Sequence, residues 1–401
     1  MFIGMLISTI GSSMIWPFLL VYVSERLNAP LTAIASLLTL NSAMGLVSSF
    51  LGGPLIDRLG RKWIMAASLV ANGTAYMFMG NAHTLLQFAI LMAITGAVNP
   101  LYRVGADAMM ADLLPQEKRI DGFALMRLSN NLGISIGPAI GGFIASSSYS
   151  LAFYCAAVGM ACYSLLLAFF AHETLPSRQP DYLPKANSGT DKKEKFGGYI
   201  TILKDAPFIN FVLTFTLVSI CATLIWVLLP VYATQTFKVS KQLYGFIPAT
   251  NAIMVVTLQL LVTRFTKRFQ TLPVVAVGAF FYAIAVGGIA FMGSFLGFWI
   301  CMVVMTIGEL IIVPTSSTYI ANLAPVNMRG RYMSFYALTW GVAAGIGPIF
   351  GGFLNDILGP SAIWYGGAVA GCLGVVFFLI LARRVALSTI KEPAQIVLPN
   401  L

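Results

Sequence analysis

Apolar residues run through this chain in long, evenly spaced blocks, separated by short stretches of Gly, Pro, Asn and charged residues. A helix of about 20 apolar residues crosses a bilayer core. We predict twelve spans, at roughly 2–23, 31–55, 63–81, 84–110, 122–146, 150–171, 208–233, 243–263, 272–293, 296–320, 333–355 and 361–382. The short alternating segments of a transmembrane barrel do not occur. The pattern therefore predicts an all-α polytopic membrane protein with twelve transmembrane helices.

Composition indicates the same class. Hydrophobic residues make up 58% of the 401 residues and charged residues 9%, whereas a soluble domain carries about a quarter charged residues. The net charge of +10 would suggest nucleic-acid binding in a soluble protein. Here the basic residues fall in short loops between spans. We therefore expect a lipid bilayer as the partner and no nucleic acid.

The basic residues are divided unevenly between the two sides of the predicted layout. Of the 24 Lys and Arg, nineteen follow even-numbered spans or lie in the C-terminal tail, and three follow odd-numbered spans. Cytoplasmic loops carry the excess of Lys and Arg in membrane proteins. Both termini are therefore predicted to be cytoplasmic.

One long polar stretch interrupts the series of spans. Residues 173–207 contain Pro176, Pro180 and Pro184 and the charge run DKKEK at 191–195, a composition typical of a flexible linker. This stretch divides the chain into an N-terminal six-helix bundle (1–172), a cytoplasmic linker (173–207), a C-terminal six-helix bundle (208–385) and a cytoplasmic tail (386–401).

The two halves share an internal repeat. ADLLPQEKR at 111–119 matches ANLAPVNMR at 321–329, and GISIGPAIGGF at 133–143 matches AAGIGPIFGGF at 343–353, both with an offset of 210. Six spans separate the copies, so they have the same orientation. A parallel repeat places a pseudo-twofold axis along the membrane normal, with a cavity between the halves. The sequence thus predicts two pseudo-symmetric halves that rock around a cavity, as alternating-access transport requires.

A charged motif with glycines, GGPLIDRLGRK at 52–62, follows the second span. Glycine permits tight turns and close helix approach, and an acid beside three cations can favour one state through ion pairs or a helix terminus. We interpret the motif as a latch that opens when the halves rock. Its residues are Gly53, Asp57, Arg58, Gly60, Arg61 and Lys62.

This motif resembles the cytoplasmic signature of the major facilitator superfamily. GISIGPAIGG in span 5 resembles the Gly-Pro motif of its antiporters, and ETLP at 173–176 resembles the end of span 6. NAIMVVTLQLLVTRFTKR at 251–268 and GELIIVPTS at 308–316 resemble spans 8 and 10 of its multidrug-efflux branch. The resemblance covers essentially the whole chain. It implies the twelve-helix fold of that superfamily, in the inner membrane of a bacterium.

The resemblance also implies roles for individual residues. Asp57 and Arg61 would form a charge latch at the cytoplasmic face, joined by Asp112 at the end of span 4. The second-half counterpart at 260–268 departs from the motif because it has three bases and no acid. The Gly-Pro motif would seal the outer side of the interface between halves, although ordinary close packing with a proline kink accounts for it as well. Its residues are Gly133, Gly137, Pro138, Gly141 and Gly142.

Ionisable residues deep in the spans point to function. A charge at the bilayer centre costs about 2.5–3.5 kcal/mol even on a lenient scale, and such groups usually face a cavity or a partner. Glu309 has no basic residue within several turns of its own helix, so desolvation favours its neutral form. We predict that Glu309 carries the proton and receives cationic substrates. The alternative is a neutral acid hydrogen-bonded between helices.

Three further charged residues lie within spans. Asp107 and Arg103 are four residues apart on one face of span 4, where they can form a fixed structural pair or take part in proton coupling. Arg127 in span 5 would counter Glu309 or Asp107 across the cavity, or stabilise the bundle.

Aromatic and amide side chains are candidate substrate contacts. Spans 1, 4, 7 and 10 line the cavity in the superfamily, and aromatic faces suit planar or cationic lipophilic molecules. Most membrane aromatics instead pack or form interface belts, and an amide in a span can equally join helices. The candidates are Trp16, Tyr22, Asn41, Tyr102, Trp226, Tyr336 and Trp340.

The sequence indicates no cofactor. No Gly-x-x-x-x-Gly-Lys-Ser/Thr nucleotide loop occurs, the five cysteines lie in apolar runs, and the two histidines have no metal-ligand spacing. We expect no enzyme activity and no metal, with a proton gradient as the energy source. The predicted function is proton-coupled export of small amphipathic or cationic molecules by a chain that functions as a monomer. The alternatives are a symporter or uniporter for a small anionic solute, and a lipid or glycolipid flippase.

Overall fold

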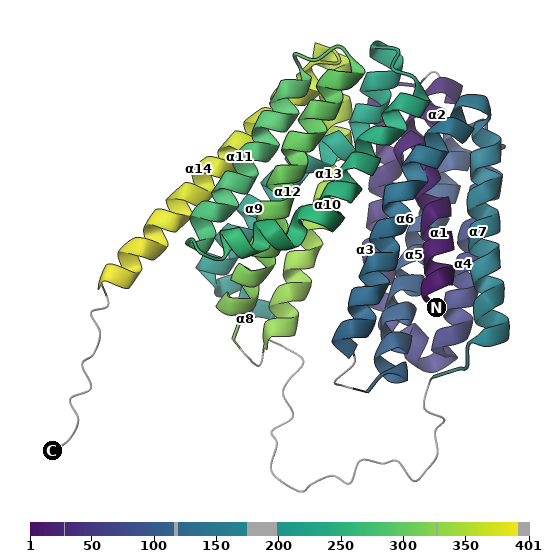
Figure 1. Ribbon diagram of the computed structural model, residues 1–401, viewed down its shortest axis with the longest axis horizontal. Helices are drawn as coiled ribbons and strands as arrows, with labels where there is room; N and C mark the ends of the chain where they lie inside the picture. The colour runs from purple at the N-terminus through teal and green to yellow at the C-terminus, as the bar shows by residue number, and fades with distance from the viewer. Residues whose placement is uncertain (28, 116–118, 175–198, 326–327, 392–401) are drawn as a thin grey trace, which may run out of the picture.

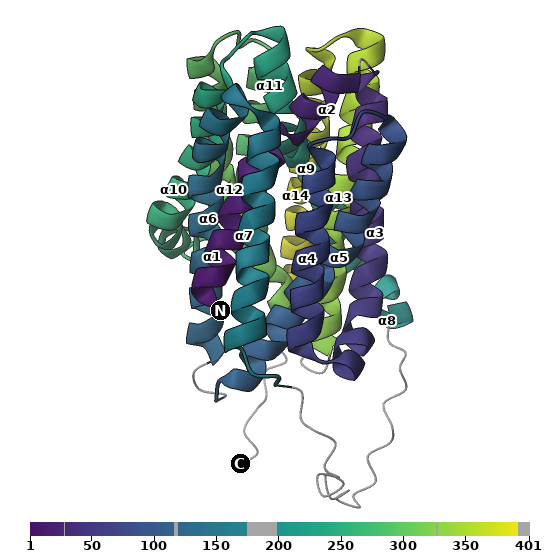
Figure 2. The same cartoon turned by 90° about the vertical axis from the view of Figure 1, so that its right-hand side faces the viewer.

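The structure is a computed structural model in which residues 1–27, 29–115, 119–174, 199–325 and 328–391 are described. Two bundles of helices lie side by side (Figure 1), one from each half of the chain. Figure 2 shows the first bundle in front of the second. Within the described ranges every regular element is helical. The first bundle consists of α1 (Phe2–Ile15), η1 (Trp16–Phe18), α2 (Leu19–Leu27), α3 (Leu31–Leu59), α4 (Arg61–Met79), α5 (Leu85–Leu113), α6 (Arg119–Ser147) and α7 (Tyr149–Phe170).

The second bundle follows a short helix at the end of the predicted linker. The short helix is α8 (Tyr199–Lys204), and the bundle consists of α9 (Ala206–Val231), η3 (Tyr232–Thr236), α10 (Lys241–Thr266), α11 (Thr271–Ile289), α12 (Phe295–Leu323), α13 (Arg329–Leu358) and α14 (Ala362–Lys391). Helix α8 lies inside 173–207, and α14 continues past residue 385 as far as Lys391.

The twelve-helix prediction is confirmed. Ten helical segments in the described part are long and apolar enough to cross a membrane, and α4 and α6 are the remaining two long helices. The first span, Phe2–Leu27, contains a 3-10 turn between two α-helical stretches. Pro17 lies in this turn, η1, between α1 and α2, and a proline has no N–H to donate. Trp16 is the first residue of the turn.

Helix starts follow the repeat. Thr84 caps α5 through a capping box with Gln87, and Ser294, its counterpart at offset 210, caps α12 by accepting a hydrogen bond from Gly297 N. Such caps satisfy N–H groups that a helix start leaves unpaired. Helices α5 and α12 therefore begin at equivalent positions of the two halves. Residues the same number of positions after the two caps consequently lie at equivalent depths in the membrane.

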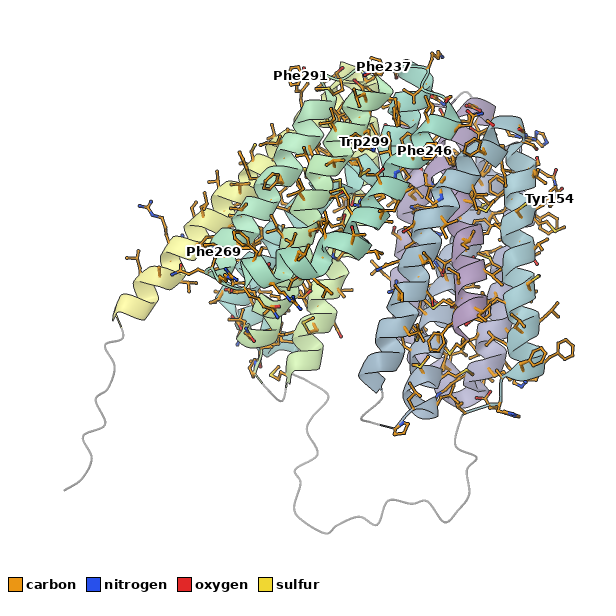
Figure 3. All side chains as sticks on the ribbon, in the orientation of Figure 1. Tyr154, Phe237, Phe246, Phe269, Phe291 and Trp299 are labelled. Atoms are coloured by element: carbon orange, nitrogen blue, oxygen red, sulfur yellow. The ribbon has the colours of Figure 1, made fainter. Side chains whose placement is uncertain are left out.

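The outer surface of both bundles is apolar, as a lipid-facing surface requires. Aromatic side chains project outward from several helices (Figure 3), with Phe291 75% and Phe269 56% exposed. The interior of the second bundle is also aromatic: the ring of Phe211 stacks against Tyr319 and lies near Tyr336 and Phe378. Aromatic or apolar character alone thus does not separate core from surface in this chain.

The two bundles meet at the end away from the linker. Helix α3 packs against α13, and α10 packs against α6. Toward the linker the bundles diverge (Figure 1), and Leu51, Leu55 and Leu59 of α3 are exposed there. The molecule is therefore closed at one face and open at the other.

Candidate functional site

A cavity of about 820 Å³ lies between the two bundles. Pockets of roughly 300–1,000 Å³ hold drug-sized ligands. Most of its wall comes from the first bundle, and α9, α10 and α12 supply the rest. Besides its tryptophans and tyrosines, its polar lining residues are Ser8, Thr9, Ser12, Ser13, Asn41, Asn72, Thr95, Asn99, Arg103, Asp107, Asn130, Asn131, Asn251 and Glu309.

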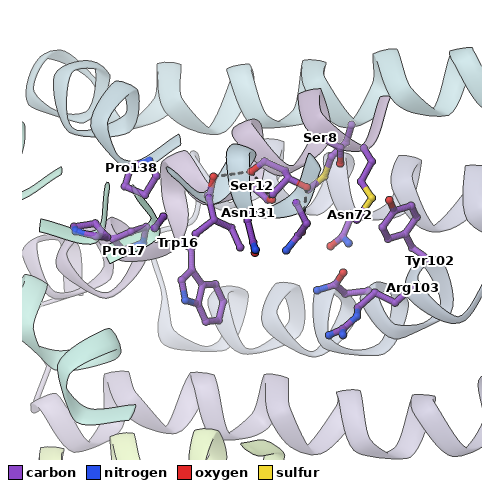
Figure 4. Close-up of a pocket in the computed structure, with 18 of the residues that line it drawn as sticks. Ser8, Ser12, Trp16, Pro17, Asn72, Tyr102, Arg103, Asn131 and Pro138 are labelled. Atoms are coloured by element: carbon purple, nitrogen blue, oxygen red, sulfur yellow. Dashed lines mark hydrogen bonds between the residues drawn. The ribbon is translucent and has the colours of Figure 1, made fainter. Parts of the chain in front are cut away.

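The first-bundle wall carries a cation and an acid on one helix. Arg103 and Asp107 are both exposed on the cavity side of α5. Figure 4 shows Arg103 projecting into the cavity together with Asn72 and Trp16. Asp107 and Arg103 are close enough to interact electrostatically. Within the described part of the chain, however, they form no ion pair with nitrogen and oxygen within 4.0 Å. The fixed structural pair considered from the sequence is not formed here.

The second-bundle wall holds the other cavity acid. Asn251 of α10 donates from Nδ2 to Glu309 Oε2 at 2.8 Å and to Thr306 Oγ1 at 2.9 Å. Thr306 lies three residues before Glu309 on α12 and donates to the carbonyl of Met302. Asn251 is 4% exposed and Thr306 is fully buried. Within the described residues Glu309 forms no ion pair, so an amide rather than a cation holds its carboxylate.

The repeat relates these side chains to partners in the first bundle. Asn41 is the counterpart of Asn251 at offset 210, and Asn99 is the counterpart of Glu309. Asn41 donates to Met92 O and Thr95 Oγ1, each at 2.9 Å, and so joins α3 to α5. Asn251 joins α10 to α12 in the same way. Both halves thus use an amide to join two helices. They differ at a second pair of equivalent positions, where the first bundle has Asn99 and the second has Glu309.

The predicted substrate-contact residues divide into two groups. Trp16, Asn41, Tyr102 and Trp226 line the cavity. Tyr22 is buried and donates from its hydroxyl to Gly80 O at 2.9 Å. The rings of Tyr336 and Trp340 lie 4.9 and 5.8 Å from that of Phe215 in the second bundle. These last three side chains pack between helices away from the cavity wall. The side chain of Arg127 lies outside the described residues.

A charged network lies at the linker face of the first bundle. Arg61, at the start of α4, forms an ion pair with Asp112 near the end of α5. Glu173 accepts hydrogen bonds from Arg61 N at 3.0 Å and Lys62 N at 3.2 Å, and thus caps α4. Gly60 has φ = 99°, a conformation that glycine adopts readily. The side chains of Asp57 and Arg58, and the surroundings of Gly53, lie outside the described residues.

The opposite face is closed by contacts between the bundles. Asp356, at the end of α13, accepts hydrogen bonds from Leu31 N at 3.1 Å and from Thr32 N at 3.0 Å. It therefore caps helix α3 of the other half. A second contact between the bundles joins α10 to α2, where Lys241 Nζ lies 3.2 Å from Glu25 Oε1. A capping residue typically contributes about 1 kcal/mol to stability, so these contacts favour the closed arrangement of this face.

The Gly-Pro motif lies at two helix interfaces. A Cβ atom added at Gly133, Gly137 or Gly141 would come within 2.7 Å of α1, and one at Gly142 would lie 2.4 Å from Lys241 O of α10. The repeat reproduces this second contact, because a Cβ at Gly352 would lie 2.8 Å from Thr32 Cα of α3. The motif thus permits close approach within the first bundle and between the bundles.

Two six-helix bundles around a polar, charged cavity define a polytopic membrane transporter. The chain belongs to the Major Facilitator Superfamily, whose sequence profile matches residues 1–236 and 211–398. Transporters are not enzymes, and the prediction of the family and its fold is confirmed.

Relatives within the superfamily have different stated activities. The chain is 26% identical over 388 residues to the Na(+), Li(+), K(+)/H(+) antiporter of Planococcus maritimus, covering 88% of this chain and 90% of that protein. It is 25% identical over 337 residues to the multidrug resistance protein MdtH of Citrobacter koseri, covering 82% and 79%.

Solved structures show the same fold. The nucleoside transporter NupG matches with a TM-score of 0.78 and 13% identity, covering 95% of this chain and 98% of that one. A bacterial homolog of the human lysosomal transporter Spinster, in an inward-facing conformation, matches with a TM-score of 0.73 and 16% identity, covering 95% and 94%. At these identities the likeness establishes the fold and leaves the substrate open.

Proposed function

We propose that the chain is a proton-coupled antiporter of a bacterial cell membrane, which exports small amphipathic or cationic compounds by alternating access. Glu309 is the proton carrier in this proposal. The observation that carries it is the position of Glu309: a carboxyl group in the cavity wall, held by Asn251. Ionisable residues at membrane depth commonly mark proton and substrate pathways.

The surroundings of Glu309 suit both a proton and a cation. A neutral amide donor does not neutralise a carboxylate, so the charged form of Glu309 remains able to attract a cationic substrate. The protonated form has no such attraction. Substrate and proton would therefore compete for one group, which is the simplest basis for exchange. Trp16 and Trp226 in the same wall offer aromatic faces for a lipophilic cation.

The closed outer face and the open linker face support export as the direction of transport. The excess of basic residues on the linker side supports a cytoplasmic location for that side by the positive-inside rule, and the bundles diverge toward it (Figure 1). An exporter loads its substrate from the cytoplasm. The conformation seen here would then be the loading state, with the contacts of Asp356 and Lys241 sealing the outer face.

The test is dye transport in proteoliposomes under an imposed pH gradient. Rhodamine 123, a lipophilic cation, is followed by fluorescence in the wild type, in Glu309→Gln and in Asp107→Asn, the latter serving to remove the cavity acid of the other bundle. We expect gradient-driven dye movement in the wild type and none in Glu309→Gln. Coupling that survives in Glu309→Gln and is lost in Asp107→Asn would move the carrier to Asp107. Absence of gradient-driven movement in the wild type, both for rhodamine 123 and for its free-acid analogue rhodamine 110, would reject the proposal.

Exchange of an alkali cation for a proton at the same carboxyl is a second candidate. A relative with 26% identity is named as a Na(+), Li(+), K(+)/H(+) antiporter, and Thr306 and Asn251 place further oxygen-bearing groups beside Glu309. In the same vesicles, dissipation of the pH gradient by added Na⁺ or K⁺ without dye would favour this candidate.

A further inference from the structure

The two cavity walls carry opposite charges that the proposed exchange does not fully use. Arg103 lines the first-bundle wall and Glu309 lines the second. No hydrogen bond or ion pair within 4.0 Å involves Arg103 in the described residues. A guanidinium presents five N–H donors in a planar fork that matches a carboxylate. An exposed guanidinium in a cavity wall is therefore available to bind an anionic group.

The depths of these two groups can be compared through the repeat. Helices α5 and α12 start after the equivalent caps Thr84 and Ser294. Glu309 is equivalent to Asn99, which lies four residues before Arg103 on α5. At 1.5 Å per residue, Arg103 is about 6 Å, or one helical turn, nearer the linker face than Glu309. The cation and the acid thus line the same cavity from different bundles, with depths that differ by about one helical turn.

Asp107 is the group that would compete for Arg103. It lies one turn further along α5 and lines the same wall. It interacts with Arg103 only at a distance beyond 4.0 Å in the described structure. A substrate carboxylate that binds the guanidinium directly would have a closer partner than Asp107 is. Asn72 and Asn99 in the same wall supply neutral donors that can hydrogen-bond the second oxygen.

We propose that the preferred substrates are amphoteric organic molecules, with an anionic group bound at Arg103 and a cationic group bound at Glu309. This inference rests on the proposed function, because it assigns substrate recognition and proton exchange to the same cavity. One ligand would bridge the two bundles. A purely cationic molecule would use only the second-bundle wall, and would bind more weakly.

Two dyes that differ in one group test the inference. Rhodamine 110 carries the xanthylium cation and a free carboxylate, and rhodamine 123 is its methyl ester. Initial transport rates are measured for both in proteoliposomes under the same pH gradient. Binding to the detergent-solubilised protein is measured in parallel by fluorescence anisotropy. A hydrogen-bonded charge pair predicts that the wild type favours rhodamine 110 by about tenfold or more.

Variants of Arg103 separate recognition from structure. We expect Arg103→Gln to abolish the preference for rhodamine 110 while rhodamine 123 transport remains, and Arg103→Lys to retain part of the preference. Equal loss for both dyes in Arg103→Gln, with rhodamine 110 binding unchanged in Arg103→Lys, would make Arg103 structural and overturn the inference.

The outcomes also distinguish this inference from the function on which it rests. If the wild type moves rhodamine 123 and shows no preference for rhodamine 110, the inference is wrong and the proposed antiport stands. If rhodamine 110 moves and rhodamine 123 does not, the inference is supported in its strongest form. If neither dye moves or binds, both proposals fall.

Discussion

Asn251 holds Glu309 from the neighbouring helix: its Nδ2 lies 2.8 Å from Glu309 Oε2, and the same nitrogen lies 2.9 Å from Thr306 Oγ1. The amide therefore links α10 to α12 and stabilises the carboxylate. A helix that moves relative to its neighbour would change this contact. The state of Glu309 and the packing of the second bundle are thereby connected.

Replacing this amide tests the connection. Asn251→Leu removes the donor and leaves the charged carboxylate with less stabilisation. A hydrogen bond to a charged group contributes about 1.5–3 kcal/mol, so deprotonation should require a higher pH. We expect the pH profile of dye transport to move upward by about one to two units. The matched control is Asn41→Leu, which removes the equivalent amide where no acid is present. A profile that moves equally in both variants would contradict the assignment.

The pair of glycine contacts between bundles can be tested with a single added carbon. A Cβ at Gly142 would lie 2.4 Å from Lys241 O, and one at Gly352 would lie 2.8 Å from Thr32 Cα. We expect Gly142→Ala and Gly352→Ala to force the outer face apart and to reduce transport severalfold. Labelling of a cysteine introduced at Ser24 reports the opening. Gly345→Ala is the control, because its Cβ would meet neighbouring atoms only at 3.9 Å and should leave labelling unchanged.

Asp356 provides a test of the cap across the two halves. Asp356→Ala removes the acceptor for the N–H groups of Leu31 and Thr32, at a cost of about 1 kcal/mol. That corresponds to about a fivefold shift in the equilibrium between outward-closed and outward-open states. Asp356→Asn retains one acceptor oxygen and should shift the equilibrium less. Distances between spin labels on the outer ends of α2 and α9 measure the shift. Identical distance distributions in all three proteins would show that the cap does not control this face.

The asymmetry between Asn99 and Glu309 leads to a prediction about moving the acid. In the double variant Asn99→Glu with Glu309→Asn, the new acid lies four residues before Arg103 on the same helix, where oppositely charged side chains attract each other. We expect this pair to hold the proton site fixed and to leave coupling absent. Adding Arg103→Gln should free the acid and restore at least part of the coupling, as measured by dye-driven proton flux. Coupling in the double variant itself would contradict this reasoning.

Much of the fold was readable from the sequence because its signals are local. Apolar runs give the spans, and an offset of 210 gives the two halves. The same offset relates the caps Thr84 and Ser294 and the contacts of Gly142 and Gly352. The position of Glu309 in the cavity wall also agrees with expectation, because few other locations in a membrane tolerate an acid.

The contacts between helices were not readable in the same way. Tyr22 and Tyr336 were candidates for the cavity, yet both pack in the interior. A tyrosine suits a cavity wall and a helix interface equally well, and the partners of these two side chains lie on helices distant in sequence. Three further contacts were also not predicted: Asn251 with Glu309, Glu173 with the start of α4, and Asp356 with the start of α3. Each joins segments far apart in sequence, and only the offset from Asn41 could have drawn attention to Asn251.

The difference between Asn99 and Glu309 has a consequence for the electrical character of transport. Each half has an amide-linked helix pair, and one half has an amide, Asn99, at the position where the other has an acid, Glu309. Within the described second-bundle wall, Glu309 is then the single acidic group. A cycle that exchanges one proton at this group for one singly charged cation moves no net charge. Such a protein would respond to a pH difference across the membrane and would be indifferent to voltage, whereas an amphoteric cargo without net charge would make the same cycle electrogenic.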